Sequence, residues 1–294
     1  MADADPTHSK AETKPPDDAA VTTPSEEKAV DRRLRPSALM LFEIVRREGA
    51  EELTRPSASL FWSGLAGGLA LSFSLAAPGM IHAATEPGPA RSLLTPLGYV
   101  IGFLIVVFGR LQLFTENTIA AILPLAADFT TATLRSVLKL NLVVFTANIA
   151  GAVLAAVVMG LTPMVEPDHL AGMLDVSRKA FDRTALETLV LAIPAGFLVA
   201  AMVWMLPAAK GAEVFVVTAI IYTLGLCGFA HVIVGAAEAG LMVTVGEAGA
   251  LTAAFGFLLP ALIGNVIGGT VLFAVLAYAQ IRDEVRQGGG SKKA

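Results

Sequence analysis

The 294-residue sequence contains little cysteine and little charge. Its single cysteine, Cys227, excludes an intrachain disulfide bond, and its position within an uncharged run predicts a small buried residue. Charged residues make up 16% of the chain and sum to a net charge of −4, with no basic stripe along the sequence. The sequence therefore gives no indication of a nucleic-acid partner.

The first 37 residues lack the apolar run after a basic start that marks a signal peptide. They are polar and rich in Pro, Glu, Lys, Asp and Thr, a composition that predicts a disordered tail over residues 1–37. Residues 38–55 then predict a short amphipathic helix, with Leu39, Leu41, Ile44 and Val45 towards one side. We expect this helix to lie at the membrane surface before the first span.

The rest of the chain is dominated by long apolar runs, since 55% of the sequence is hydrophobic and the mean hydropathy is +0.68. These values disfavour the alternative of a soluble protein with a very apolar core. A membrane-crossing helix needs about 20 apolar residues, and the two runs on either side of Gln112 reach that length only together. We therefore predict an all-α integral membrane protein with six transmembrane helices over residues 56–282, the second of them broken. The uncharged runs are 56–85, 92–109, 117–127, 140–165, 188–209, 214–237 and 248–281.

Lysine and arginine placement predicts the orientation, because cytoplasmic loops are enriched in these residues. With both termini inside and the first 30 residues set aside, thirteen basic residues fall inside and four outside. The outside set is Arg91, Arg178, Lys179 and Arg183. The inside set is Arg32, Arg33, Arg35, Arg46, Arg47, Arg55, Arg135, Lys139, Lys210, Arg282, Arg286, Lys292 and Lys293. We expect a multi-pass protein of the cell (inner) membrane with both termini, including a tail over 283–294, in the cytoplasm.

The spans carry an internal repeat. The third span aligns with the sixth, matching Asn148 with Asn265 at an offset of 117. The second aligns with the fifth, matching Thr115 with His231 at an offset of 116. The first aligns with the fourth, matching 65–72 with 193–200. Each half contains an odd number of spans, so the two halves must insert in opposite orientations. We therefore predict an inverted 3+3 repeat.

Polar residues interrupt the second and fifth spans. The stretch GRLQLFTENT (109–118) breaks the second span, and LGLCGFAHVIVG (224–235) breaks the fifth and contains His231. Breaks at membrane depth are tolerated only where protein buries them or where they line a wet cavity. Their matching repeat positions predict a small polar site between apolar constrictions. The alternative is a pair of packing kinks with satisfied polar groups.

Three motifs resemble the formate/nitrite transporter (FNT) family: LFTENT at 113–118, GFAH at 228–231 and GNVIGG at 264–269. The similarity covers roughly residues 38 to 284. The arrangement of Arg110, Glu116 and Asn117 around the loop is similar to the YfdC-like branch of this family.

The resemblance implies an aquaporin-like protomer with broken second and fifth helices, assembled in the lipid bilayer as a homopentamer with one pore per protomer. It also implies transport of small monovalent anions such as formate, nitrite or hydrosulfide, in some members coupled to protons. By motif, the implied substrate pathway consists of Thr115, His231, Asn265 and Asn148, and the implied constrictions of Tyr99, Phe103 and Leu224.

The sequence departs from the family pattern at three places. Gly196 stands where that pattern has an asparagine, and Tyr99 and Phe103 replace the usual Phe and Leu of a constriction. Arg110 and Glu116 add charges to the loop of the second span. Together with Asn117, these two residues are expected to set which anions the loop selects. Two alternatives remain for Arg110, which either positions the anion or pairs with Glu116.

A bare anion crosses hydrocarbon only at high cost, so the pathway must supply hydrogen-bond donors or a proton. Histidine titrates near neutrality, and His231 is therefore the candidate for either role, with Thr115 completing the site. Glu238, seven residues further on, either lines the outer vestibule or belongs to a solvated face. Asn148 and Asn265 either contact the substrate or bridge helix backbones.

Two other classes of function were weighed. An intramembrane enzyme with His231 as acid or base is disfavoured, because the sequence contains no metal-ligand set, no nucleophile with a base at motif spacing and no phosphate loop. No cofactor is expected. The second alternative is a membrane scaffold or sensor of the same fold that has lost transport.

Overall fold

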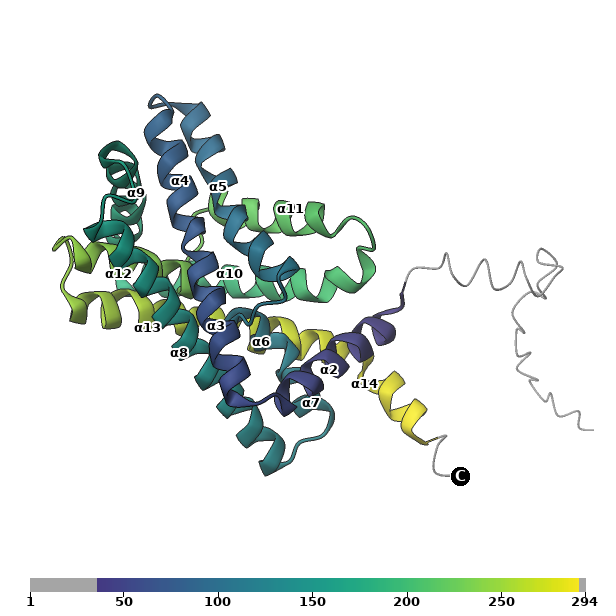
Figure 1. Ribbon diagram of the computed structural model, residues 1–294. Coiled ribbons are helices and arrows are strands. Elements are labelled where there is room, and N and C mark those ends of the chain that lie inside the picture. Colours follow the sequence, from purple (N-terminus) through teal and green to yellow (C-terminus); the bar gives the residue numbers. More distant parts are fainter. Residues whose placement is uncertain (1–35, 291–294) are drawn as a thin grey trace, which may run out of the picture. The chain divides into compact units, whose positions relative to one another are not determined.

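The computed structural model describes residues 36–290, with side chains described as far as residue 284 (Figure 1). Residues 1–35 of the expected N-terminal tail and residues 291–294 of the expected C-terminal tail lie outside the described residues. Within the part of the chain that the structure describes, every regular element is a helix. The all-α prediction is therefore confirmed.

The first three spans are made of six helices. The first span combines α3 (Ser57–Leu71) and α4 (Phe73–Ala84), and the third is α8 (Thr131–Leu161). The second span is divided, as the sequence predicts, into α5 (Pro89–Phe108), α6 (Phe114–Ala120) and α7 (Ile122–Ala127).

The second half repeats this order after an outer helix, α9 (Pro167–Phe181). The fourth span is α10 (Ala185–Met205) with the short η1 (Leu206–Ala208), and the fifth is divided into α11 (Glu213–Leu226) and α12 (Val232–Thr244). The sixth span is continuous but contains two π-helical segments, η2 and η3. It comprises η2 (Thr252–Leu258), α13 (Leu259–Val266), η3 (Ile267–Ala274) and α14 (Val275–Gly290).

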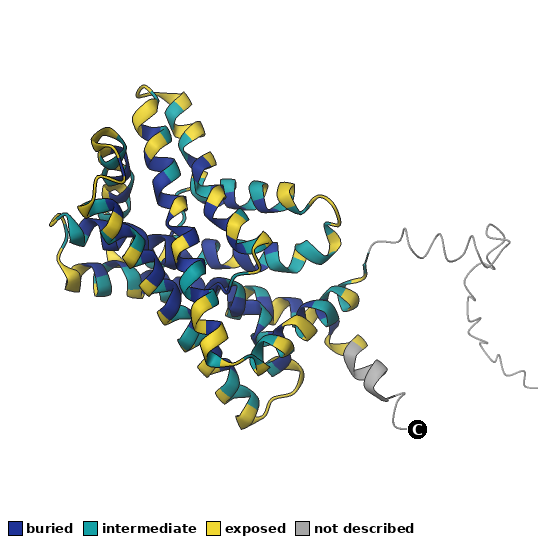
Figure 2. Cartoon of the chain, in the orientation of Figure 1, coloured by how far each residue is buried: buried dark blue, intermediate teal, exposed yellow. Residues whose placement is uncertain are grey.

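Five helices are long and apolar enough to cross a membrane, and α11 and α12 are shorter apolar helices that together supply the remaining span. The outer faces of these helices stay apolar. On α5, for example, Leu97, Ile101, Ile105 and Phe108 are exposed at helical spacing, whereas buried residues concentrate where the spans meet (Figure 2). An exposed apolar stripe of this kind suits contact with lipid or with another subunit.

Equivalent glycines bring the first and last spans of each half into close contact. A Cβ atom at Gly68 of α3 would overlap the backbone oxygen of Asn148 on α8, and a Cβ atom at Gly196 of α10 would overlap the backbone oxygen of Asn265 on α13. The helices of each pair run side by side (Figure 1), with the two backbones in direct contact at these positions. The two contacts match the sequence alignment of 65–72 with 193–200. They also explain Gly196, because an asparagine side chain has no room there.

Helix α2 (Ala38–Thr54) lies at the range where the sequence predicts an amphipathic helix. Ser37 caps its start by accepting a hydrogen bond from the Met40 N–H at 3.2 Å. Its buried residues are Phe42, Val45 and Gly49, and a Cβ atom at Gly49 would overlap the Ala120 carbonyl of α6. Helix α2 is therefore packed against the end of the interrupted second span.

Cys227 is exposed, which corrects the prediction of a buried residue. It follows the last residue of α11, where the helix turns into the loop of the fifth span. A run of apolar residues in a membrane protein fixes the depth of a side chain but not the face of the helix on which it lies.

Candidate functional site

The two interrupted spans break with the same backbone geometry. The helix before each break ends in a Schellman motif, in which two N–H groups after the helix donate back to carbonyls of its last turn. The residue in the left-handed conformation is Arg110 after α5, with φ 49°, and Gly228 after α11, with φ 63°. The bonds are Arg110 N to Val107 O (3.2 Å) and Leu111 N to Val106 O (3.0 Å) in the first break, and Gly228 N to Gly225 O (3.1 Å) and Phe229 N to Leu224 O (3.0 Å) in the second.

The helix after each break also begins in the same way. Leu113 precedes α6 and His231 precedes α12, each with an extended backbone. The offset between the breaks is therefore 118 residues, and His231 is equivalent to Leu113. The sequence alignment of Thr115 with His231 was wrong by two positions, because it superposed the most polar residues of each break instead of the helix starts.

Asn148 and Asn265 hold these breaks in place through hydrogen bonds to backbone groups. The Asn148 side-chain oxygen accepts from Phe114 N–H at 2.9 Å, and its amide donates to the carbonyls of Gly64 at 2.7 Å and Gln112 at 2.9 Å. Asn265 repeats the pattern, accepting from Val232 N–H at 2.9 Å and donating to the carbonyls of Ala192 at 2.8 Å and Ala230 at 2.9 Å. All amide hydrogens are used by backbone, which supports the alternative that these residues bridge helices.

Thr115 and His231 meet at the centre of the protein. Their Oγ1 and Nε2 atoms are 2.8 Å apart, and both side chains are buried. His231 is also the N-cap of α12, where its Nδ1 accepts from Val234 N–H at 3.4 Å. This pattern assigns the ring proton to Nε2, from which it is donated to Thr115. The structure thus brings together the two residues expected to form the centre of the pathway.

Two of the three residues expected to form constrictions, Phe103 and Tyr99, lie beside this pair. The Phe103 ring packs edge-on against the His231 ring with centroids 5.0 Å apart, and Tyr99 stacks on Phe103 at 6.0 Å. Phe103 and Leu224 are fully buried. His231 is therefore shielded by an aromatic ring on the side of α5.

A cavity of about 290 Å³ leads to His231 and is called the vestibule here. Its lining includes His231 and Tyr99 at the inner end, and Lys179, Arg183 and Glu238. Arg183 donates from Nη1 to the Gly228 carbonyl at 2.8 Å, which anchors it beside the second break. Lys179 makes no hydrogen bond or ion pair with any residue that the structure describes. The vestibule thus contains cationic groups within reach of an entering anion.

The basic residues of the vestibule were not predicted as site residues from the sequence, although a signal was present. Three of the four basic residues assigned to the outside, Arg91, Lys179 and Arg183, line the vestibule. The fourth, Arg178, lines an adjoining pocket of about 410 Å³. Glu238 also lines the vestibule, so the alternative of a solvated outer face is wrong.

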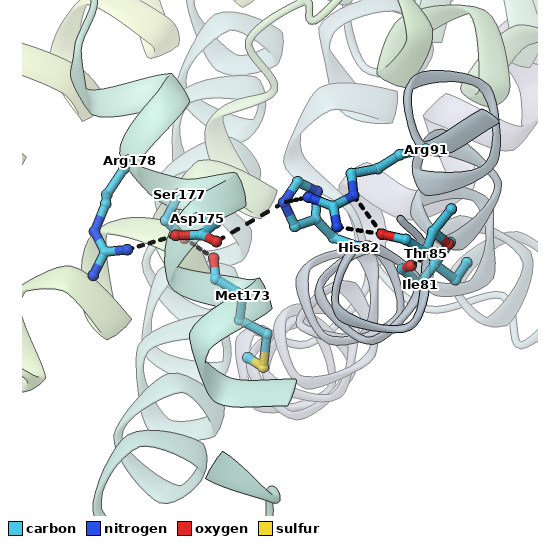
Figure 3. A network of polar contacts seen from close by, with 8 residues as sticks. All are labelled: Ile81, His82, Thr85, Arg91, Met173, Asp175, Ser177 and Arg178. Atoms are coloured by element: carbon cyan, nitrogen blue, oxygen red, sulfur yellow. Dashed lines mark hydrogen bonds and ion pairs between the residues drawn. The ribbon is translucent and has the colours of Figure 1, made fainter. Parts of the chain in front are cut away.

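A polar network at the rim of the vestibule ties α9 to α4 and α5 (Figure 3). Arg178 donates to Asp175 at 2.6 Å and to Glu247 at 2.7 Å. The hydrogen bond from Arg178 lowers the pKa of the Glu247 carboxyl group. On the other side, Asp175 lies 3.9 Å from His82 Nε2, which is 3.3 Å from Arg91 Nη1, and Arg91 also donates to the Thr85 carbonyl. These contacts fix the helix that carries Lys179.

The remaining loop residues face a different set of partners. Arg110 is exposed, and the described residues contain no ion pair between Arg110 and Glu116. One Glu116 oxygen is buried without a hydrogen-bond partner. Asn117 donates to Gln112 at 3.4 Å, and Gln112 donates to Glu52 of α2 at 2.7 Å. The loop is held by α2 and not by the Arg110–Glu116 pair that the sequence left as an alternative.

Comparisons with known proteins agree with this arrangement. The family model described as formate/nitrite transporter matches residues 39–279. The chain is 35% identical over 253 residues to "Inner membrane protein YfdC" of Escherichia coli (strain K12), covering 86% of this chain and 82% of that protein. It is 28% identical over 191 residues to "Formate-nitrite transporter 3" of Toxoplasma gondii (strain ATCC 50611 / Me49), covering 61% of this chain and 37% of that protein.

Two solved structures have the same fold. "Pentameric formate channel with formate bound" superposes with a TM-score of 0.66 at 17% identity, covering 77% of this chain and 97% of that chain. "FNT family ion channel" superposes with a TM-score of 0.72 at 15% identity, covering 82% and 98%. The matched family consists of transporters, so the intramembrane enzyme is excluded. The chain is a multi-pass membrane protein of the formate/nitrite transporter family.

Proposed function

We propose that the protein conducts small monovalent anions, such as formate or nitrite, across the inner membrane. We further propose that it does so as a homopentamer with one pathway per protomer and with both termini in the cytoplasm. The family match, the inner-membrane relative and the pentameric formate channel of the same fold support this proposal. The observation that carries it is the cationic vestibule that ends at the buried Thr115–His231 pair.

The anion enters the vestibule under the attraction of Lys179 and Arg183. These residues are four positions apart at the end of α9, and both line the cavity. A narrow cavity with low-dielectric walls strengthens this attraction and raises the local concentration of the anion. The anion then reaches His231, whose Nε2–H and the adjacent Thr115 hydroxyl replace part of its hydration shell.

The buried Phe103 ring, packed against His231, keeps water away from this centre. An anion passes such a region more readily as a neutral acid than as an ion, which favours transport accompanied by a proton. A scaffold that has lost transport has no use for a cationic cavity leading to a buried Thr–His pair. Conduction is therefore the function that the site supports best.

The direct test is anion flux into liposomes containing the purified protein, measured separately for formate, nitrite, acetate, chloride and hydrosulfide. We expect flux of formate or nitrite, reduced several-fold at low salt by the double substitution Lys179→Gln and Arg183→Gln. The difference should shrink as salt is added, because the charges are screened. Absence of flux for every anion would overturn the proposal.

A matched control is available on α8. Arg135 and Lys139 have the same four-residue spacing and are exposed outside the vestibule. The double substitution Arg135→Gln and Lys139→Gln removes the same net charge, and we expect it to leave flux unchanged. Native mass spectrometry of the protein in detergent tests the assembly, with five chains expected.

A further inference from the structure

We propose that Glu238 is the proton donor of the vestibule: it passes a proton to the incoming anion before the anion reaches His231, and so speeds conduction of weak-acid anions relative to anions of strong acids. The inference rests on the proposed function and adds a residue and a substrate class to it.

The position of Glu238 is unusual for a carboxyl group. It lies on α12, whose residues are buried along its length as far as Met242, and its own exposed fraction is 9%. It lines the same cavity as His231 and is the one acidic side chain in that lining. Its carboxyl group makes no hydrogen bond or ion pair with any described residue. The group is therefore available to a molecule in the vestibule.

The charged and titratable groups that face Glu238 across the vestibule come from four elements. Lys179 of α9 and Arg183 of the following turn lie on one side, and His231 lies at the start of the same helix as Glu238. His82 of α4 and Arg91 and Tyr99 of α5 complete the lining. A permanently charged carboxylate would weaken the attraction of these cations for an anion. A carboxyl group that exchanges a proton does not have this disadvantage, and it meets the anion where the cations hold it.

His231 is poorly placed to supply the proton. Its Nε2–H is donated to Thr115, and its Nδ1 accepts from Val234 N–H. An additional proton would have to occupy Nδ1, where it would face that N–H group and break the cap of α12. A positive charge at the N-terminus of a helix is also opposed by the helix dipole. His231 therefore serves as a neutral hydrogen-bond donor, and the proton has to come from another group.

The transfer balances without any further reactant. The O–H bond of the protonated Glu238 breaks, and an O–H bond forms on an oxygen of the anion, which leaves a neutral acid and a Glu238 carboxylate. Lys179 and Arg183 face the same cavity and stabilise this carboxylate. Water in the vestibule then returns a proton to Glu238 from the outer solution. One proton accompanies each anion, and transport in the other direction reverses these steps.

The test compares Glu238→Gln with the wild-type protein in liposomes, using formate as the weak-acid anion and nitrate as the strong-acid anion. At neutral pH we expect Glu238→Gln to lower formate flux on the order of a hundredfold, the lower end of what a positioned proton donor contributes. Formate flux should recover in acidic buffer, where formic acid is supplied by the solution. Nitrate flux should not fall. Glu238→Asp, which keeps a carboxyl group, should retain the wild-type pH profile.

The sign of the effect separates this role from simple repulsion. If Glu238 acts only as a negative charge, Glu238→Gln raises formate flux, and that result, or an unchanged flux, would overturn the inference. Glu166→Gln, at an exposed residue outside the vestibule, is the charge-matched control. A pH-sensitive dye inside wild-type liposomes gives an independent measurement should the variant fail to fold. Formate entry without proton entry would also overturn the inference.

Failure of the proposed function would give a different result in the same flux assay. In that case the wild-type protein passes no anion at any pH. When the wild-type protein conducts formate with a pH profile that Glu238→Gln leaves unchanged, the proposed function stands and only the role of Glu238 is lost.

Discussion

Arg110 and Gly228 occupy the same backbone position in the two halves of the protein. Each is the left-handed residue that ends the helix before a break, with φ values of 49° and 63°. Glycine adopts this conformation without strain, whereas an L-residue with a side chain does so at a cost of roughly 1–2 kcal/mol. Arg110 is the one non-glycine residue with positive φ among the described residues. A strained arginine at the break of a membrane span leads to the hypothesis that its side chain is needed there.

We therefore expect Arg110→Gly to stabilise the protein by about 1 kcal/mol while changing the rate or selectivity of anion flux. The unfolding temperature in detergent measures the first effect, and the liposome assay measures the second. Gly228→Ala is the paired test and should destabilise the protein, since a residue with a Cβ atom adopts the left-handed conformation of Gly228 (φ 63°) only at a cost. A lower unfolding temperature for Arg110→Gly would show that the left-handed backbone is not strained.

Asn148 and Asn265 should matter more for the stability of the protein than for recognition of an anion. Asn148→Ala or Asn265→Ala leaves two backbone groups of a break without their side-chain partner, the N–H of Phe114 or Val232 and the carbonyl of Gln112 or Ala230, each at a cost of about 1–3 kcal/mol. We expect both variants to lose the folded protein at markedly lower temperature, measured by thermal unfolding in detergent. Asn141→Ala is the control, because that side chain donates only to Val137 of its own helix. Equal effects at positions 141 and 148 would contradict this account.

Much of the fold could be predicted from the sequence because the bilayer sets the length of each uncharged run. The repeat was also visible in the sequence, because both halves need the same residue types at equivalent positions. Gly68 and Gly196, for example, make close backbone contacts that leave no room for a side chain. The register of the breaks could not be read from residue types, because Leu113 and His231 are chemically unlike yet share a backbone position. Only the helix starts reveal their equivalence.

The importance of Thr115 and His231 was indicated by the motif, but the cationic lining of the vestibule was not. Lys179 and Arg183 reach it only because α9 packs across α4, a contact between segments about 100 residues apart. Helical spacing alone does not predict that Glu238 faces the same cavity. Almost all of α12 is buried, so the spacing of its buried residues does not distinguish one face of the helix from another. Tertiary packing decided which polar side chains meet.

Gly196 provides a test of the packing within the second half. A Cβ atom there would overlap the backbone of Asn265, and neither backbone can move without disturbing the second break. We expect Gly196→Ala to destabilise the protein by about 1–3 kcal/mol, as overpacked cores do. Gly256→Ala, where the nearest atom to the added Cβ lies 3.7 Å away, should be neutral or stabilising. Thermal unfolding compares the two, and a stable Gly196→Ala protein would contradict the close contact.

The rim of the vestibule should loosen in acid. The hydrogen bond from Arg178 lowers the folded-state pKa of Glu247, so the pair stabilises the folded protein above the ordinary glutamate pKa. This contribution is lost as the pH falls through the lowered value. The difference in unfolding temperature between the wild-type protein and Glu247→Gln should therefore be largest near neutrality and shrink towards pH 3. A difference that grows in acid would show that the pair has the opposite linkage.

The pairing of Thr115 with His231 leads to the last prediction. Thr115→Val keeps the shape of the side chain but removes the hydroxyl that accepts from His231 Nε2, whereas Thr115→Ser keeps the hydroxyl. A buried hydrogen bond of this kind is worth about 1 kcal/mol, which corresponds to roughly a fivefold change in rate if it is formed during passage. We expect Thr115→Val to lower anion flux by about that factor and Thr115→Ser to retain it. His231→Phe should alter the flux or its pH dependence more strongly, because it removes the donor itself. Wild-type flux and pH dependence in His231→Phe would mean that the anion takes a route that avoids this pair.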